Sequence, residues 1–73
     1  MSVNIVMSVI KSIELIGSSP NGWEDAVKSA INEAKKTIRN IRRVTVDDLE
    51  VLIENDEITS YQSKVKLYFT IER

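Results

Sequence analysis

The 73-residue sequence contains neither cysteine nor histidine, and these two absences exclude many of the devices that small domains use. Without cysteine there is no disulfide, and without either residue the usual ligands of a structural zinc ion are missing. Catalysis by Ser-His or Cys-His pairs is excluded for the same reason. Of the common ways to stabilise so small a chain, self-association is the one that remains.

Net charge and long apolar runs are also lacking. The formal net charge is −1, which provides no basic surface for nucleic acid. No apolar run approaches the roughly 20 residues of a membrane span, and residues 1–9 carry no basic segment of the kind that begins a signal peptide. We therefore expect a single cytoplasmic domain over residues 1–73, with no membrane or nucleic-acid partner.

Residues 23–42 contain no glycine or proline, and their amphipathic pattern predicts one helix. Apolar residues recur there at steps of one, three or four, which places them on one stripe of a helix. The stripe consists of Trp23, Ala26, Val27, Ala30, Ile31, Ala34, Ile38 and Ile41. Because three of these are alanines, a broad surface can come close to the helix axis, which favours packing on a sheet. Trp23 is the only tryptophan, and its place on the stripe predicts a core position.

The ends of this helix are also marked by sequence signals. Asn21 or Gly22 is the expected N-cap, and the acidic residues that follow suit the positive end of the helix dipole. Arg39, Arg42 and Arg43 are expected at the C-terminal end, where cations are favourable.

Segments with period-two alternation flank the helix and predict three strands, over residues 7–16, 44–53 and 58–71. Residues 17–22 form the turn into the helix, residues 54–57 form a hairpin turn, and residues 1–6 form a lead-in that packs on a neighbour. The alternation changes phase at Asp47-Asp48, which predicts a β-bulge. The order β-α-β-β predicts an α+β fold, with a three-stranded antiparallel sheet wrapped partly around one helix. A long hairpin behind so small a domain leaves apolar surface for another copy to cover.

Three blocks of this sequence resemble one known family. They are Ser12-Ile13-Glu14-Leu15-Ile16-Gly17-Ser18-Ser19-Pro20, then Gly22-Trp23-Glu24-Asp25-Ala26, and Tyr61-Gln62 in the third predicted strand. Together they are similar to the first strand, turn, helix start and third strand of dodecins, over residues 9–72. The resemblance implies a homo-dodecamer that forms a hollow shell, and a non-catalytic role in binding and storing riboflavin or FMN.

The resemblance also implies where a flavin would bind. Flavin-binding dodecins stack the ring on a tryptophan at the start of the second strand and hydrogen-bond it with a glutamine of the third. Gln62 matches the glutamine, whereas Arg43 stands at the tryptophan position. Some dodecin relatives without this tryptophan are similar to ion-binding rather than flavin-binding members.

Several candidate residues allow more than one interpretation. Arg42 and Arg43 could complement the helix end and pair with Asp47 or Asp48, or Arg43 could stack on a planar ring or bind a ligand phosphate. Gln62 could be a subunit-contact amide or a ligand of the flavin ring. Asp47 and Asp48 could form a solvated or subunit-pairing face, or supply oxygen ligands to a divalent cation.

Two functions follow from these interpretations. The first is a small-ligand binding and storage shell, with flavin as the leading ligand and Gln62, Arg43 and Arg42 as its contacts. The alternative is a dodecin-like assembly that binds no flavin and has a structural or cation-binding role at Asp48 and Asp47. No nucleophile and base recur at a spacing that indicates an enzyme.

Overall fold

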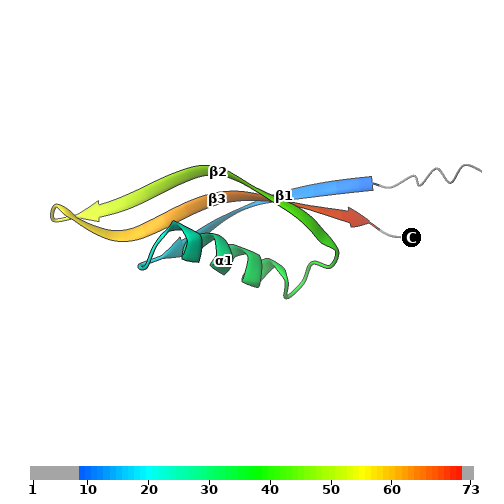
Figure 1. Cartoon of the computed structure of the whole chain (residues 1–73), viewed down its shortest axis with the longest axis horizontal. Coiled ribbons are helices and arrows are strands. Elements are labelled where there is room, and N and C mark those ends of the chain that lie inside the picture. Colours follow the sequence, from blue (N-terminus) through cyan, green and yellow to red (C-terminus); the bar gives the residue numbers. More distant parts are fainter. Residues whose placement is uncertain (1–8, 72–73) are drawn as a thin grey trace, which may run out of the picture.

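The computed structural model describes residues 9–71, which form one helix packed on one face of a three-stranded sheet (Figure 1). The elements are β1 (Val9–Ser19), α1 (Trp23–Ala34), β2 (Ile41–Glu54) and β3 (Glu57–Ile71). The central strand is β3, which is antiparallel to both β1 and β2. The predicted fold class and element order are therefore confirmed. The predicted lead-in, residues 1–6, and the first two residues of the predicted first strand lie outside the described residues.

The helix is shorter than its apolar pattern predicted. It ends at Ala34 instead of Arg42, and Lys35–Thr37 form a turn that is closed by a hydrogen bond from Ile38 N to Ala34 O. β-branched Thr37 and Ile38 favour helix less than alanine does, and Asn40 has a left-handed φ of 62° that redirects the chain into β2. Ile38 and Ile41 keep their apolar role by packing on the core from outside the helix. The arginines 39, 42 and 43 therefore do not cap α1.

The turn before the helix is also shorter than expected. β1 continues to Ser19, and residues 17–19 pair with residues 61–63 of β3. Gly17 is buried where α1 crosses β1, and a Cβ at this position would overlap the carbonyl oxygen of Ala26. Glycine is therefore the residue that lets the helix approach the strand so closely. Gly22 is the N-cap residue, as one of the two predicted alternatives had it.

The core lies between the small stripe of the helix and the middle of the central strand. Ala26, Ala30 and Ala34 are buried on the helix, and Val65 and Leu67 are fully buried on β3. Ile13, Leu15, Val27, Ile38, Ile41 and Val44 pack around them. The prediction that the alanine stripe faces the sheet is confirmed.

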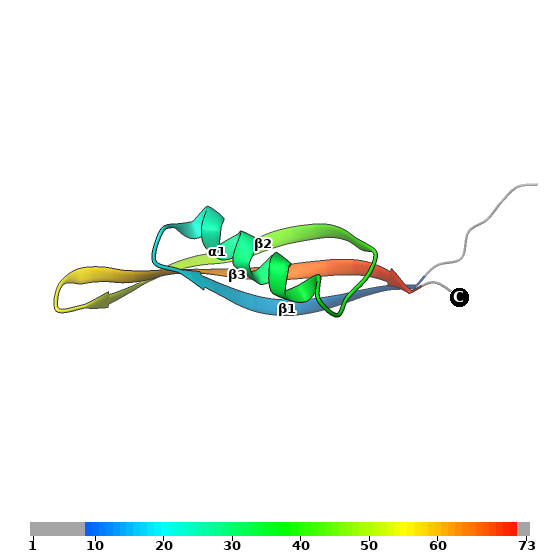
Figure 2. The same ribbon diagram turned by 90° about the horizontal axis from the view of Figure 1, so that it is seen from below.

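The hairpin of β2 and β3 extends well beyond the helix (Figures 1 and 2). The described residues span 66 × 21 × 15 Å, and the hairpin forms one end of this long axis. Its turn is closed by two residues, Asn55 and Asp56, with φ values of 51° and 63° that fit a type I′ turn. A register shift between Val46 and Asp48 places the predicted bulge at Asp47. No helix within residues 9–71 is long and apolar enough to cross a membrane.

Trp23 does not occupy the core position that the sequence predicted, because 41% of its surface is exposed. Its Nε1–H donates to the carbonyl oxygen of Glu50 at 3.0 Å, and its ring meets Tyr61 edge-on with centroids 5.2 Å apart. The Ser63 hydroxyl donates to the carbonyl oxygen of Trp23 at 3.1 Å. Trp23 is the first helical residue and lies beside the hairpin instead of over the sheet centre. It therefore anchors the start of α1 to β2 and β3.

We expect Ala30→Leu to destabilise the fold by about 1–3 kcal/mol, because the larger side chain overpacks the contact between α1 and Val65. The matched control is Ser29→Leu, which places the same side chain at the neighbouring, exposed helix position. Thermal or urea unfolding measures the difference. Equal stability of the two variants would show that the stripe does not pack on the sheet.

Candidate functional site

The candidate residues lie on the sheet face opposite the helix, which we call the outer face. Because side chains alternate along a strand and Ser63, Val65 and Leu67 point toward the helix, their even-numbered neighbours on β3 point away from it. Cross-strand pairing adds the residues of β1 and β2 that lie opposite them. The outer face comprises Ser12, Glu14, Ile16 and Ser18 of β1, Arg43, Thr45, Asp48 and Glu50 of β2, and Gln62, Lys64, Lys66 and Tyr68 of β3.

Arg43 and Tyr68 form the most defined contact on this face. They pair across β2 and β3, and the guanidinium carbon of Arg43 lies 4.1 Å from the centre of the Tyr68 ring. This is within the range of a cation–π contact. The other side of the planar guanidinium can still face a ligand, because Arg43 is exposed. The guanidinium thus stacks on a ring of the protein itself, and the predicted stacking of Arg43 on a ligand ring stays a prediction.

The pairing of Arg43 with acidic residues is not found. No ion pair joins Arg43 to Asp47 or Asp48 within residues 9–71. Arg42 is exposed and lies at the register shift between Ile41 and Arg43. Tyr68 was not among the candidate residues predicted from the sequence. Period-two alternation along β3 nevertheless places its side chain on the outer face, opposite that of Phe69. Its pairing with Arg43 depends on the register of β2 on β3, which the shifts between Leu52 and Ile53 and between Val46 and Asp48 determine.

Gln62 is half-buried on the outer face but lies far from Arg43. It pairs with Glu50 on one side and Ser18 on the other, six residues along β3 from Tyr68. At about 3.3 Å per residue, this separation is about 20 Å. One chain therefore does not bring Gln62 and Arg43 onto the same ligand ring.

The bulge places Asp47 next to Thr45, whose hydroxyl donates to Asp47 Oδ1 at 3.2 Å. Asp48 lies opposite Lys64, which forms an ion pair with Glu14 at 3.6 Å. No group of three or more acidic, histidine or cysteine side chains within residues 9–71 is arranged to hold a metal ion. Asp47 and Asp48 would therefore need further oxygen ligands, from hydroxyl or carbonyl groups, water or another copy, to hold a cation.

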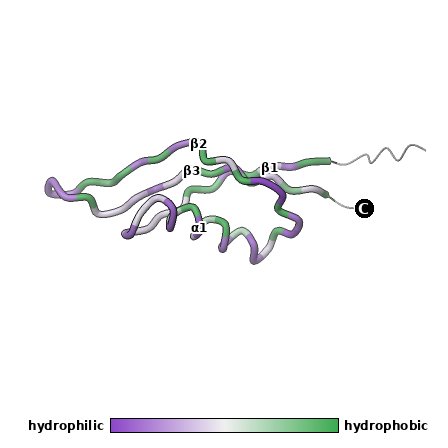
Figure 3. The backbone as a smooth tube through the Cα atoms, in the orientation of Figure 1, coloured by the Kyte–Doolittle hydropathy of each residue, from purple (hydrophilic) through white to green (hydrophobic). Residues whose placement is uncertain are grey.

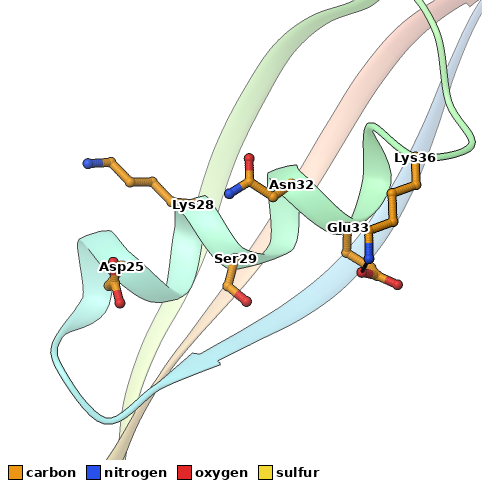
Figure 4. Close-up of a pocket in the computed structure, with 6 residues that line it drawn as sticks. All are labelled: Asp25, Lys28, Ser29, Asn32, Glu33 and Lys36. Atoms are coloured by element: carbon orange, nitrogen blue, oxygen red, sulfur yellow. Dashed lines mark ion pairs between the residues drawn. The ribbon is translucent and has the colours of Figure 1, made fainter.

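The polar face of α1 carries further charged residues, drawn in Figure 4. Asp25 Oδ2 accepts hydrogen bonds from the Ser19 hydroxyl at 2.9 Å and from the side-chain amide of Asn21 at 3.3 Å, and these bonds lower the pKa of Asp25. Glu33 pairs with Lys36 at 2.8 Å, and its hydrogen bond and charge raise the pKa of Lys36. These contacts join α1 to the end of β1 and to the turns on either side of the helix. Their evident role is to stabilise the ends of α1.

Comparison with known proteins gives the same family over nearly the whole chain. The family model Dodecin matches residues 9–72. This chain belongs to the dodecin family. Over 63 residues it is 32% identical to the calcium dodecin of Mycobacterium tuberculosis, covering 86% of this chain and 89% of that protein. Over 64 residues it is 31% identical to the dodecin of Thermus thermophilus, covering 88% and 93%.

Solved dodecin structures share the fold. The dodecin of Streptomyces coelicolor superposes with a TM-score of 0.89 at 28% identity, covering 94% of this chain and 99% of that one. The structure of the M. tuberculosis calcium dodecin superposes with a TM-score of 0.80 at 29% identity, covering 89% and 93%. That protein is described as a calcium-chelating antigen with a calcium-binding site. Membership of this family supports binding and storage of a small ligand as the general role of the chain.

Proposed function

We propose that this dodecin sequesters a small planar anion, with FMN as the leading ligand, in a hollow shell of twelve identical copies. The observation that carries the proposal is the guanidinium of Arg43, stacked on Tyr68 and exposed at the outer face. The function is binding and storage instead of catalysis, and the cytoplasm is the expected compartment.

Arg43 favours a ligand that is both flat and negatively charged. A guanidinium can stack on an aromatic ring and can bind a phosphate with two parallel hydrogen bonds. Tyr68 holds the group on one side, which limits the side-chain entropy that binding removes. Riboflavin has the ring but lacks the phosphate, so it can use only one of the two interactions. FMN uses both, with Arg42 as a second cation close by.

Two features of the single chain support a shell of several copies. Arg43 and Gln62 lie about 20 Å apart along the sheet, so both reach one flavin only if a second copy supplies one of them. Large apolar side chains are also exposed on β1, β2 and β3 at Ile10, Ile16, Leu49, Ile53 and Ile58. Exposed apolar surface of this extent is typical of an interface.

The assembly can be tested by light scattering at low protein concentration. We expect a mass near that of twelve chains, because self-association is the stabilising device left to a chain without disulfide or zinc. A monomer or dimer at every concentration would contradict the shell.

The ligand can be tested by fluorescence titration of FMN and riboflavin. We expect wild type to bind FMN more tightly by roughly 1.5–3 kcal/mol, the usual contribution of a hydrogen bond to a charged group. Arg43→Gln should abolish this preference. Arg43→Trp, with Gln62 retained, should strengthen riboflavin binding by about 0.5–1.5 kcal/mol and quench its fluorescence through the new aromatic contact.

Lys28→Gln is the matched control, because it removes one cation from the polar face of α1. It should leave both affinities unchanged. Equal binding of FMN and riboflavin by wild type, or an unaltered preference in Arg43→Gln, would show that Arg43 does not hold the ligand.

A second candidate is a dodecin assembly that binds a divalent cation and no flavin. It is favoured by the bulge that projects Asp47 beside Thr45 and Asp48, and by the relative named calcium dodecin. Symmetry-related copies would have to supply the remaining oxygen ligands. If this function is correct, calcium titration by calorimetry gives saturable binding that Asp47→Asn weakens at least tenfold. Glu24→Gln, on the exposed face of α1, is the control. Absence of saturable calcium binding to wild type would exclude it.

A further inference from the structure

Charged residues are segregated along the second half of this chain. Residues 35–43 carry five cations and no acid, at Lys35, Lys36, Arg39, Arg42 and Arg43. Residues 47–57 carry six acids and no cation, at Asp47, Asp48, Glu50, Glu54, Asp56 and Glu57. The net charge of −1 is therefore small because a basic region and an acidic region nearly cancel each other.

A groove with an apolar floor lies in the basic region, where α1 ends and β2 begins. It is lined by Ile31, Lys35, Ile38, Arg39, Asn40 and Ile41. The three isoleucines are half-buried, whereas Lys35 and Arg39 are exposed at its rim. Neither cation forms an ion pair within the part of the chain that the structure describes. The groove thus offers apolar contact together with two positive charges.

The hairpin tip, residues 53–58, has the complementary composition. Ile53 and Ile58 face each other across β2 and β3 and are 61% and 53% exposed. The acidic residues Glu54, Asp56 and Glu57 follow at the turn, and none of them forms an ion pair within residues 9–71. Figure 3 shows this change from apolar strand to hydrophilic tip. Its two-residue turn leaves little freedom, so the tip is a preformed wedge.

The tip and the groove of one chain cannot meet. Ile53 and Ile41 are twelve residues apart on the same strand, which is about 40 Å. Figures 1 and 2 show the tip at one end of the long axis and the loop after α1 far from it. A contact between the two regions must therefore join different copies.

We propose that the hairpin tip of one copy docks in the groove of a second copy. Ile53 and Ile58 contact the isoleucine floor, and the acidic turn lies against Lys35 and Arg39. The interface is head-to-tail, because two different surfaces meet, and its repetition closes into a ring when the rotation between copies permits. This docking rests on the proposed self-assembly and assigns it a specific contact.

The absence of cysteine makes this contact directly testable by thiol cross-linking. Lys35→Cys combined with Glu57→Cys places one thiol at the groove rim and one at the tip of each copy. A short bifunctional thiol reagent should then produce covalent trimers and larger species. Either single variant should stop at dimers, since each copy has only one thiol. Lys28→Cys with Glu57→Cys is the matched control, with the first thiol on the polar face of α1, and should show no species above the dimer.

Charge reversal provides a second test that does not depend on thiol geometry. Lys35→Glu with Arg39→Glu should raise the concentration at which the assembly dissociates at least tenfold. Adding Glu54→Lys and Glu57→Lys should restore assembly, and circular dichroism verifies that each variant is folded. A double-cysteine variant that stops at dimers, or a charge reversal without effect on a wild-type oligomer, overturns the docking and leaves the proposed shell intact. A wild type that stays monomeric overturns both.

Discussion

The close approach of α1 to the sheet is the constraint on which the rest of this structure depends. Gly17 has no Cβ where the backbone of Ala26 crosses β1, and three alanines let the helix lie directly over Val65 and Leu67. The core is therefore thin and made of small helical side chains against β-branched and leucine side chains. Because all of this packing uses one face of the sheet, the other face is left for polar residues.

Because the helix covers one face of the sheet, the candidate residues lie on the other face, and part of the hairpin is not covered by its own chain. The outer face carries Arg43 on Tyr68 at one end and Gln62 at the other, with alternating charges between them. A helix of 12 residues covers only part of strands of 14 and 15 residues, so the hairpin extends past its own core. Trp23 marks the border, since its indole reaches the backbone of Glu50 while its ring stays partly exposed.

Periodicity predicted the elements well because each element has a face that must be buried. Three further features were predictable from the sequence: the bulge at Asp47, the hairpin turn, and the burial of Ala30 and Ala34. The helix end was not, because Ile38 and Ile41 fit the helical stripe yet reach the same core from a loop and a strand. The predicted core position of Trp23 was wrong because the apolar stripe of a helix does not show where the sheet beneath the helix ends.

Candidate residues could be selected from the sequence, whereas their relative positions could not. The resemblance to dodecins selected Gln62 and Arg43, whereas Tyr68 became visible only when the register placed it under the guanidinium. Sequence spacing also could not show that Gln62 and Arg43 lie at separate ends of one outer face. That separation supports the proposal that more than one copy contributes to the site.

The most direct measurement is a crystal structure of the assembled protein grown with saturating FMN. The account predicts FMN on the outer face, with its phosphate or ring against Arg43 of one copy and its ring edge within hydrogen-bond distance of Gln62 of another. FMN bound on the polar face of α1, or outer-face sites that stay empty at saturating FMN, would contradict it.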